Sequence, residues 1–283
     1  MTQQLIDYRI QWKPPGHQPG AVRGVSAGIG DQLRALALLR DYPDPRRLDL
    51  RASLRDPFER LYVRDTYLNT ACKVIVMVDA SASMGYVGAV DRWQVAQDIA
   101  AQLALAAYKS GDAFGLYVAN ANMVKAATIL PRLNRSAWLW IQQHFPQIKP
   151  QGNRADGLLK VTAQLPKRRS LVFLVSDFRW PEHQLKSMLK QLSHHDVVPV
   201  WLEDPQEALQ APKKGMAMLQ DAETGQSRFV WMRAGLIKQL TQHRAQRIQT
   251  MRQRCKAYGY KPFLVNGAFQ PLAFTHYFME RHT

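Results

Sequence analysis

The sequence predicts an α/β fold, a doubly wound and mostly parallel β-sheet covered by helices. Two short segments, residues 74–79 (VIVMVD) and 171–177 (LVFLVSD), are almost entirely apolar and end in an acid. Apolar runs of this length are typical of strands that are buried on both faces. Amphipathic stretches separate them, and strands that alternate with helices favour parallel pairing. We therefore expect an α/β domain over residues 73–204.

The elements of this domain follow in order along the chain. Residues 91–112 carry apolar side chains at helical spacing up to Gly111, which predicts a long helix after the first strand. Next we expect a strand, two helices, the second apolar strand, a helix and a strand, at residues 113–120, 136–145, 155–165, 170–177, 181–195 and 196–204.

Two extensions flank the domain. Residues 1–72 form an N-terminal segment that we expect to pack on the domain, with irregular structure at 17–30, a short helix at 31–42 and a strand at 60–67. Residues 205–283 form a basic C-terminal extension. Its pattern predicts a hairpin over residues 215–231, a long basic helix over about 234–257, a strand at 262–266 and a terminal helix after it.

The composition is strongly basic. Lys and Arg number 38 against 22 Asp and Glu, a net charge of +16, and residues 224–279 contain no acid at all. Such a surface attracts polyanions, acidic protein faces or anionic lipids. The chain shows no apolar run of membrane-spanning length and no secretory signal, so we expect a cytoplasmic protein. Cys72 and Cys255 lack metal-site spacing, which favours two idle thiols.

Oxygen-bearing side chains follow both apolar strands. Asp79 and Asp177 end neighbouring strands at the carboxyl edge, where open parallel sheets bind ligands. Alternation after Asp79 aims Ser81 and Ser83 to the same side. Two hydroxyls and two carboxylates are hard oxygen ligands of the kind that Mg²⁺ prefers. The sequence therefore predicts a site for Mg²⁺, or another divalent cation, at this edge.

These residues carry a resemblance. The stretch DASAS at 79–83 resembles the Asp-x-Ser-x-Ser signature of the metal-ion-dependent adhesion site of von Willebrand factor A-type domains, and VSDF at 175–178 resembles their second acidic loop. The resemblance implies a von Willebrand factor A-like fold and adhesion without covalent chemistry. The open metal position would accept a carboxylate from a partner protein.

A second resemblance covers almost the whole chain. Residues 46–55 (RRLDLRASLR) and 221–226 (DAETGQ) are similar to a bacterial unknown-function family with this fold, although Leu48 and Leu50 replace its usual Ile and Trp. Such proteins are often encoded beside MoxR-type AAA+ ATPases, some in gene clusters that mature metalloenzymes such as methanol dehydrogenase. The resemblance thus implies a MoxR-type AAA+ partner. Residues 46–55 could also be a structural network of Arg and Asp pairs.

One loop departs from the family pattern. The family offers a Thr before an Asp in the loop after the central helices, whereas this chain reads QGNRADGLL at 151–159. If Asp156 is the matched acid, Ala155 stands in the place of the Thr and supplies no oxygen. Asn153 or Asp156 could substitute as a weaker metal ligand.

Two other function classes can be weighed. A serine nucleophile at Ser81 or Ser83 would need a base and an oxyanion hole, and neither serine stands in a G-x-S-x-G elbow; the chain also has no Walker A loop. The leading hypothesis is therefore a non-enzymatic, chaperone-like adaptor that binds protein through its metal site. The alternative is binding of nucleic acid or an anionic surface by Arg244, Arg247 and Arg252.

Overall fold

The computed structural model describes residues 6–8, 10, 12, 14, 19–152, 156–204, 215–220, 227–232 and 234–281. The chain divides into two units. One comprises residues 1–9, 73–109 and 113–283, and the other comprises residues 10–72 and 110–112. We call the first the sheet unit and the second the hairpin unit, and each is described by itself.

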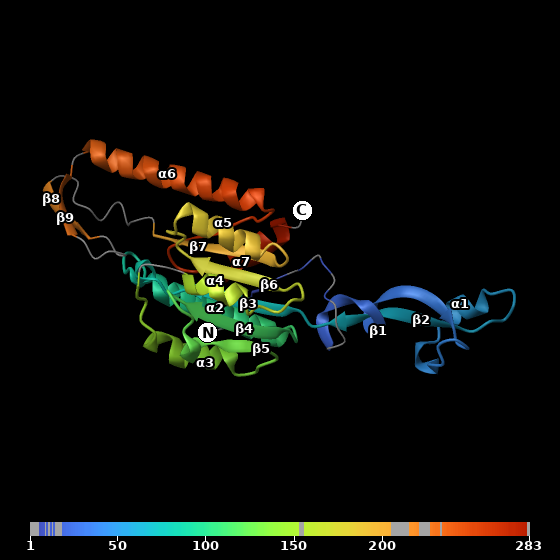
Figure 1. The fold of residues 1–283 in the computed structure, drawn as a ribbon. Coiled ribbons are helices and arrows are strands. Elements are labelled where there is room, and N and C mark those ends of the chain that lie inside the picture. Colours follow the sequence, from blue (N-terminus) through green and yellow to red (C-terminus); the bar gives the residue numbers. More distant parts are fainter. Residues whose placement is uncertain are drawn as a thin grey trace. The chain divides into compact units, whose positions relative to one another are not determined.

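A six-stranded, mostly parallel sheet forms the centre of the sheet unit (Figure 1). Its strand order is β10-β7-β6-β3-β4-β5, and all neighbouring strands are parallel except the pair β4 and β5. The strands are β3 (Lys73–Asp79), β4 (Ala113–Ala119), β5 (Ile129–Arg132), β6 (Leu171–Ser176), β7 (Asp196–Glu203) and β10 (Phe263–Asn266). The predicted doubly wound α/β fold is confirmed.

Helices cover both faces of this sheet. They are α2 (Arg92–Lys109), α3 (Ala137–His144), α4 (Asp156–Thr162), α5 (Glu182–Gln191), α6 (Ala234–Ala257) and α7 (Pro271–Arg281). Ile75 and Met77 pack in one core with residues of α4, α5 and α6. On strand β6, Phe173 faces the opposite side of the sheet and contacts the rings of Phe274 and Phe278 in α7. The period-2 alternation along each strand therefore supplies both cores.

The C-terminal extension contributes to the sheet itself. Its predicted hairpin is present as β8 (Gly215–Gln220) and β9 (Ser227–Met232), although the turn at 221–226 lies outside the described residues. Strand β10 pairs with β7 in parallel, so residues from beyond position 204 complete the edge of the sheet. The boundaries at residues 72 and 204 stay predictions.

The hairpin unit differs from what the sequence predicts. An antiparallel pair of strands, β1 (Pro19–Leu38) and β2 (Tyr62–Thr70), dominates it, and α1 (Leu50–Leu54) lies in the connection. The predicted irregular segment and the predicted short helix at 31–42 are both wrong, because pairing with β2 overrides the local preference of a Gly-rich stretch. The pairing register shifts four times along β1, which accommodates the irregular composition.

Charged pairs within the hairpin unit involve the segment at 46–55. Asp49 caps α1 by accepting a hydrogen bond from the Ala52 amide at 3.0 Å, and it also accepts one from Arg64 Nε at 2.8 Å. Ser53 Oγ donates to the Asp49 carbonyl and accepts from the Tyr62 amide. These contacts tie α1 to β2. The expected packing of residues 1–72 on the α/β domain stays a prediction.

Three smaller observations complete the fold. Cys72 and Cys255 are both buried thiols, and neither forms a disulfide within the part of the chain that the structure describes. Among the described residues, none of the helices combines the length and apolarity needed to cross a bilayer. The edge strand β5 was not anticipated, because Pro131 argues against a strand, yet proline is tolerated at a sheet edge.

Candidate functional site

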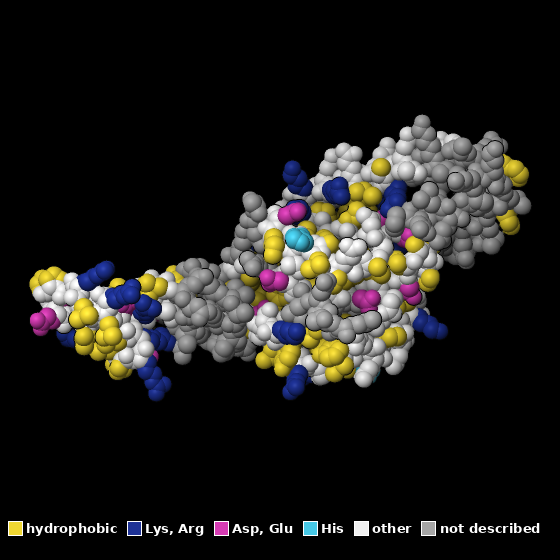
Figure 2. Space-filling view, turned by 180° about the vertical axis from the view of Figure 1, so that it is seen from behind, with side chains coloured by type: hydrophobic (Ala, Val, Ile, Leu, Met, Phe, Trp, Pro, Cys, Tyr) yellow, Lys and Arg dark blue, Asp and Glu magenta, His cyan; other side chains and the backbone are white. Residues whose placement is uncertain are grey.

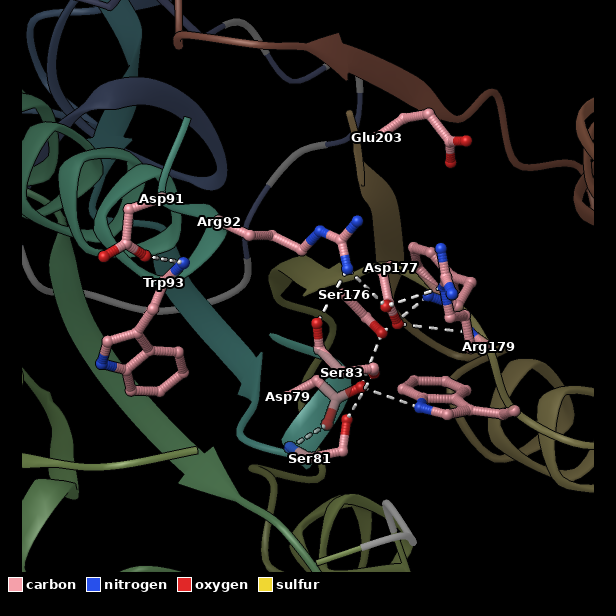
Figure 3. Close-up of polar contacts among 12 residues, drawn as sticks. Asp79, Ser81, Ser83, Asp91, Arg92, Trp93, Ser176, Asp177, Arg179 and Glu203 are labelled. Atoms are coloured by element: carbon pink, nitrogen blue, oxygen red, sulfur yellow. Dashed lines mark hydrogen bonds and ion pairs between the residues drawn. The ribbon is translucent and has the colours of Figure 1, made fainter. Parts of the chain in front are cut away.

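The carboxyl ends of β3 and β6 lie side by side and both end in buried acids. Val78 of β3 is in register with Val175 of β6, so Asp79 and Ser176 follow at the same edge. Asp79 is 0% exposed and Asp177 is 1% exposed. Figure 3 shows both carboxylates in one cluster with Ser81 and Ser83. The four principal residues predicted from the sequence therefore come together.

The turn after β3 presents the two serines. The Asp79 Oδ1 atom accepts a hydrogen bond from the Ser81 amide at 2.9 Å, and a short 3-10 turn (Ala82–Gly85) follows. Ser81 Oγ and Ser83 Oγ lie 3.3 Å apart, so the two hydroxyls point to the same side, as expected. Ser81 makes no side-chain capping bond to the 3-10 turn, which removes the simplest structural reason for a serine there.

Asp79 is held by donors from the strand beside it. Its Oδ2 atom accepts hydrogen bonds from Ser176 Oγ at 2.7 Å and from Trp180 Nε1 at 2.8 Å. Burial first, and then the negative charge of Asp177, raise the pKa of Asp79 to about 6, against the hydrogen bonds from Ser176 and Ser81. Phe178 follows with a positive φ of 51° and donates its amide to Ser176 Oγ, so a strained turn carries the loop past Asp79.

Two guanidinium groups contact Asp177. Arg92 Nη1 donates to Asp177 Oδ2 at 2.9 Å, and Arg179 Nε lies 3.2 Å from the same oxygen. Arg92 Nη1 also donates to the Ser83 carbonyl at 2.8 Å. The Arg92 side chain is only 3% exposed, whereas that of Arg179 is 31% exposed. The Arg92–Asp177 pair is thus a buried ion pair that links the two acidic loops.

Helix α2 delivers Arg92 to this position. Asp91 precedes the helix, and its Oδ1 atom accepts hydrogen bonds from the amides of Trp93 and Gln94. This arrangement is a typical N-terminal cap, and it fixes the start of α2 beside the turn after β3. The Arg92 guanidinium also lies 5.1 Å from the centre of the Tyr86 ring. Arg92 is therefore positioned by its own helix as well as by Asp177.

A third loop runs beside the two serines. The Gln151 amide donates to the Ala80 carbonyl, and the Ala82 amide donates to the Gly152 carbonyl. Asn153, a weaker candidate ligand, lies outside the described residues. Asp156 begins α4, where its Oδ1 atom accepts a hydrogen bond from Gln184 Nε2 at 2.7 Å. Asp156 therefore contacts the start of α5, and its role as a metal ligand stays a prediction.

The donor set can be tested against the expected cation. Asp79 Oδ2 already accepts two hydrogen bonds and Asp177 Oδ2 accepts one from Arg92, and the charges of the two acids face those of Arg92 and Arg179. Mg²⁺ prefers six oxygens with negative charge among them. The described residues also contain no cluster of three or more His, Cys, Asp or Glu side chains. A bound cation would have to compete with these donors and positive charges, and the Mg²⁺ site stays a prediction.

Four of the residues in the cluster were not anticipated. Ser176, Arg179 and Trp180 flank Asp177 in the segment SDFRW, and their proximity to a strand end was the available signal. Arg92 carried another signal, because a cation at the N-terminus of a helix is unfavourable for the helix dipole. A buried acid nearby is the usual compensation.

A second acidic end lies on the next strand of the same edge. Glu203 ends β7, is 4% exposed and accepts hydrogen bonds from Arg244 and Arg247 of α6. The following residue, Asp204, accepts the Ala89 amide at 2.8 Å. Glu203, Asp204 and Arg92 are among the residues that line a small pocket. Buried acids therefore continue along this edge past Asp177.

These features define a class of protein. An open, mostly parallel sheet with Asp-x-Ser-x-Ser after one central strand and an acid after its neighbour is the arrangement of a von Willebrand factor A-like α/β protein. The chain belongs to the family described as "Protein of unknown function DUF58", whose model matches residues 41–250.

The names of three similar proteins state no activity. The uncharacterized protein Rv1480 of Mycobacterium tuberculosis is 25% identical over 228 residues, which span 78% of this chain and 70% of that protein. An uncharacterized protein in the moxR 3′ region of Paracoccus denitrificans is 41% identical over 66 residues, 23% of this chain and 63% of that protein. Among solved structures, the conserved hypothetical protein BatB of Bacteroides thetaiotaomicron has a TM-score of 0.47 and 14% identity, covering 75% of this chain and 99% of BatB.

Proposed function

We propose that this protein is a non-enzymatic adaptor that binds a MoxR-type AAA+ ATPase through the carboxyl edge of its sheet. The joint task would be maturation or assembly of another protein, with metalloenzymes such as methanol dehydrogenase as the class of client. The observation that carries the proposal is the cluster of Asp79, Ser81, Ser83 and Asp177 at the edge where open parallel sheets bind their ligands.

Similarity supports the choice of partner. The relative from Paracoccus denitrificans is named for its place in the moxR 3′ region. A gene next to that of an AAA+ ATPase commonly encodes a protein that works with it, and the resemblance of this chain to its family implies the same pairing.

The chemistry of the cluster supports a binding role over catalysis. Ser81 Oγ and Ser83 Oγ bond to each other, and Ser176 Oγ donates to a carboxylate. Histidine, the usual base for a nucleophilic serine, is not among the contacts described for these hydroxyls. Buried side chains that are held by mutual hydrogen bonds keep this edge of the sheet rigid, which suits recognition.

A co-purification experiment tests the proposal. Tagged native protein is incubated with the MoxR-type ATPase encoded nearest to it, in Mg²⁺ and again in EDTA, and compared with Asp79→Ala and Asp79→Asn. Asp98→Ala is the matched control, because Asp98 is exposed on α2 and bonds to Gln94 of the same helix. We expect the ATPase to be recovered with the native and control chains and lost with both Asp79 variants.

Two outcomes would decide whether the contact needs a metal and whether docking takes place at this edge. Loss of the complex in EDTA would support the metal-bridged contact that the sequence predicts. Equal recovery with native and Asp79 variants, all shown to be folded by circular dichroism, would exclude docking at this edge.

The alternative, binding of nucleic acid or an anionic surface, depends on the basic helix α6. Arg244 and Arg247 hold buried Glu203, and Arg254 lies 2.9 Å from Glu182. These pairs give the three arginines structural roles within the sheet unit, whereas Arg252 is exposed. If duplex DNA binds, its affinity should fall with salt at a log–log slope of about −0.9 per phosphate contacted. A slope unchanged by Arg252→Gln would contradict a role for α6.

A further inference from the structure

The charges at the carboxyl edge of the sheet already balance one another without a bound ion. Two carboxylates, Asp79 and Asp177, share the cluster with two guanidinium groups, Arg92 and Arg179. A bound dication would therefore enter a cluster without net negative charge. Electrostatic attraction, the main driving force for binding Mg²⁺ to oxygen ligands, is largely cancelled here.

The lone pairs of the carboxylates point to the same conclusion. A carboxylate oxygen offers about two acceptor positions. Asp79 Oδ2 accepts from Ser176 and Trp180, and Asp177 Oδ2 faces both arginines. Asp79 Oδ2 is therefore fully engaged, and Asp177 Oδ2 accepts one hydrogen bond from Arg92 and faces a second guanidinium at 3.2 Å. A cation would have to compete with these donors.

Arg92 makes the connection that a bridging cation would make. A metal in this position would join the loop of Ser81 and Ser83 to the loop of Asp177. The Arg92 guanidinium joins the same two loops, through the Ser83 carbonyl at 2.8 Å and Asp177 Oδ2 at 2.9 Å. Its location at the first position of α2, against the helix dipole, is costly without Asp177.

We infer that Arg92 is the built-in cation of this site, which replaces the divalent ion and makes the edge of the sheet metal-independent. The two loops at this edge are then held together by Arg92 equally in the presence and absence of Mg²⁺. The inference concerns the same edge as the proposed docking function. Its test uses the isolated chain, so it can fail while docking stands, or stand while docking fails.

The test is a titration of the native chain with Mn²⁺, followed by electron paramagnetic resonance, alongside thermal unfolding in Mg²⁺ and in EDTA. An ion bound at 100 times its Kd would raise the Tm of a chain this size by roughly 5–10 °C. We expect no saturable Mn²⁺ site and the same Tm in Mg²⁺ and EDTA. We expect Arg92→Met, which keeps an unbranched stem without the guanidinium and its charge, to gain a saturable Mn²⁺ site that a further Asp79→Asn change removes.

Controls keep the inference falsifiable. Arg92→Lys retains the charge and should bind Mn²⁺ no better than the native chain. Near-ultraviolet circular dichroism shows whether Arg92→Met is folded, and if it is not, the native titration decides alone. A single Mn²⁺ site in the native chain that Asp79→Asn abolishes would overturn the inference. A folded Arg92→Met chain without gained binding would also overturn it.

Discussion

The sheet unit and the hairpin unit use different means to stay folded. Strands β3, β6 and β7 are buried along almost their whole length, with apolar cores on both sides. The hairpin unit instead shows large apolar side chains to solvent, with Leu54 85% exposed and Phe58 74% exposed. Figure 2 shows hydrophobic side chains on its surface beside Lys and Arg.

This difference indicates that the two units are stabilised by different interactions. Apolar burial contributes roughly 25 cal/mol per Å², so the sheet unit draws its stability from its two cores. The hairpin unit relies on backbone pairing of β1 with β2 and on ion pairs such as Arg34–Asp65 and Arg64–Asp49. Exposed ion pairs contribute little. We therefore expect equivalent substitutions to have very different effects in the two units.

The largest contrast is expected between two phenylalanines. Phe173→Ala removes a fully buried ring that contacts Phe274 and Phe278, and it should lower the free energy of unfolding by about 3–5 kcal/mol. Phe58→Ala in the hairpin unit should change it by less than about 0.5 kcal/mol. Urea unfolding followed by circular dichroism measures both. Similar losses for the two variants would refute the contrast.

A second contrast concerns ion pairs. Arg281 and Asp196 form a pair in which each side chain is 10% exposed, so Arg281→Met leaves a buried carboxylate and should cost about 3–5 kcal/mol. The double variant with Asp196→Asn should recover part of this loss. Arg64→Met, which removes a side chain that is 61% exposed, should leave the thermal midpoint nearly unchanged. A large loss for Arg64→Met would show that ion pairs hold the hairpin unit.

The smallest effect is expected in the pH dependence of each unit. Burial lowers the pKa of His195 from its usual 6.5, with the charges of His194 and Arg169 acting in the same direction. The unfolded chain then binds more protons, so the stability of the sheet unit should fall as pH drops through 6.5 and below. His195→Gln should flatten this dependence, while His183→Gln, at an exposed histidine of α5, serves as the control.

The hairpin unit should respond in a different pH window. The hydrogen bond from Arg60 holds the pKa of Asp56 well below its usual 3.8. The contribution of this carboxylate is present above that value and is lost as pH falls below it. Hydrogen exchange measured segment by segment at several pH values would separate the two windows. A hairpin unit that loosens between pH 7 and 6 would contradict this assignment.

Prediction from the sequence succeeded where local pattern and tertiary role agree. Helix α6 begins and ends at the expected residues, and β6 forms because a run of Leu, Val and Phe suits a strand with two covered faces. Strand β5 was missed, because its pairing depends on Gly115 of β4. A Cβ atom at Gly115 would lie 2.8 Å from Pro131, a long-range contact that local sequence does not reveal.

The candidate site also contains residues that the sequence predicts and residues that it does not. Asp79, Ser81, Ser83 and Asp177 could be predicted, since each follows an apolar strand by a few residues and parallel topology brings the strand ends together. The side chains that donate hydrogen bonds to these acids could not be predicted. Arg92 and Trp180 reach the cluster from the start of a helix and from a strained turn, so their roles depend on how separate elements pack.

Strand β10 also bears on how the chain folds during synthesis. Residues 263–281 supply both the last parallel strand and the rings of Phe274 and Phe278 that cover Phe173. Ribosomes make proteins from the N-terminus, so β7 has an open edge and one core lacks its covering helix until these residues emerge. The nascent protein therefore passes through a stage with an exposed strand edge and an aromatic surface, the kind of surface that general chaperones bind.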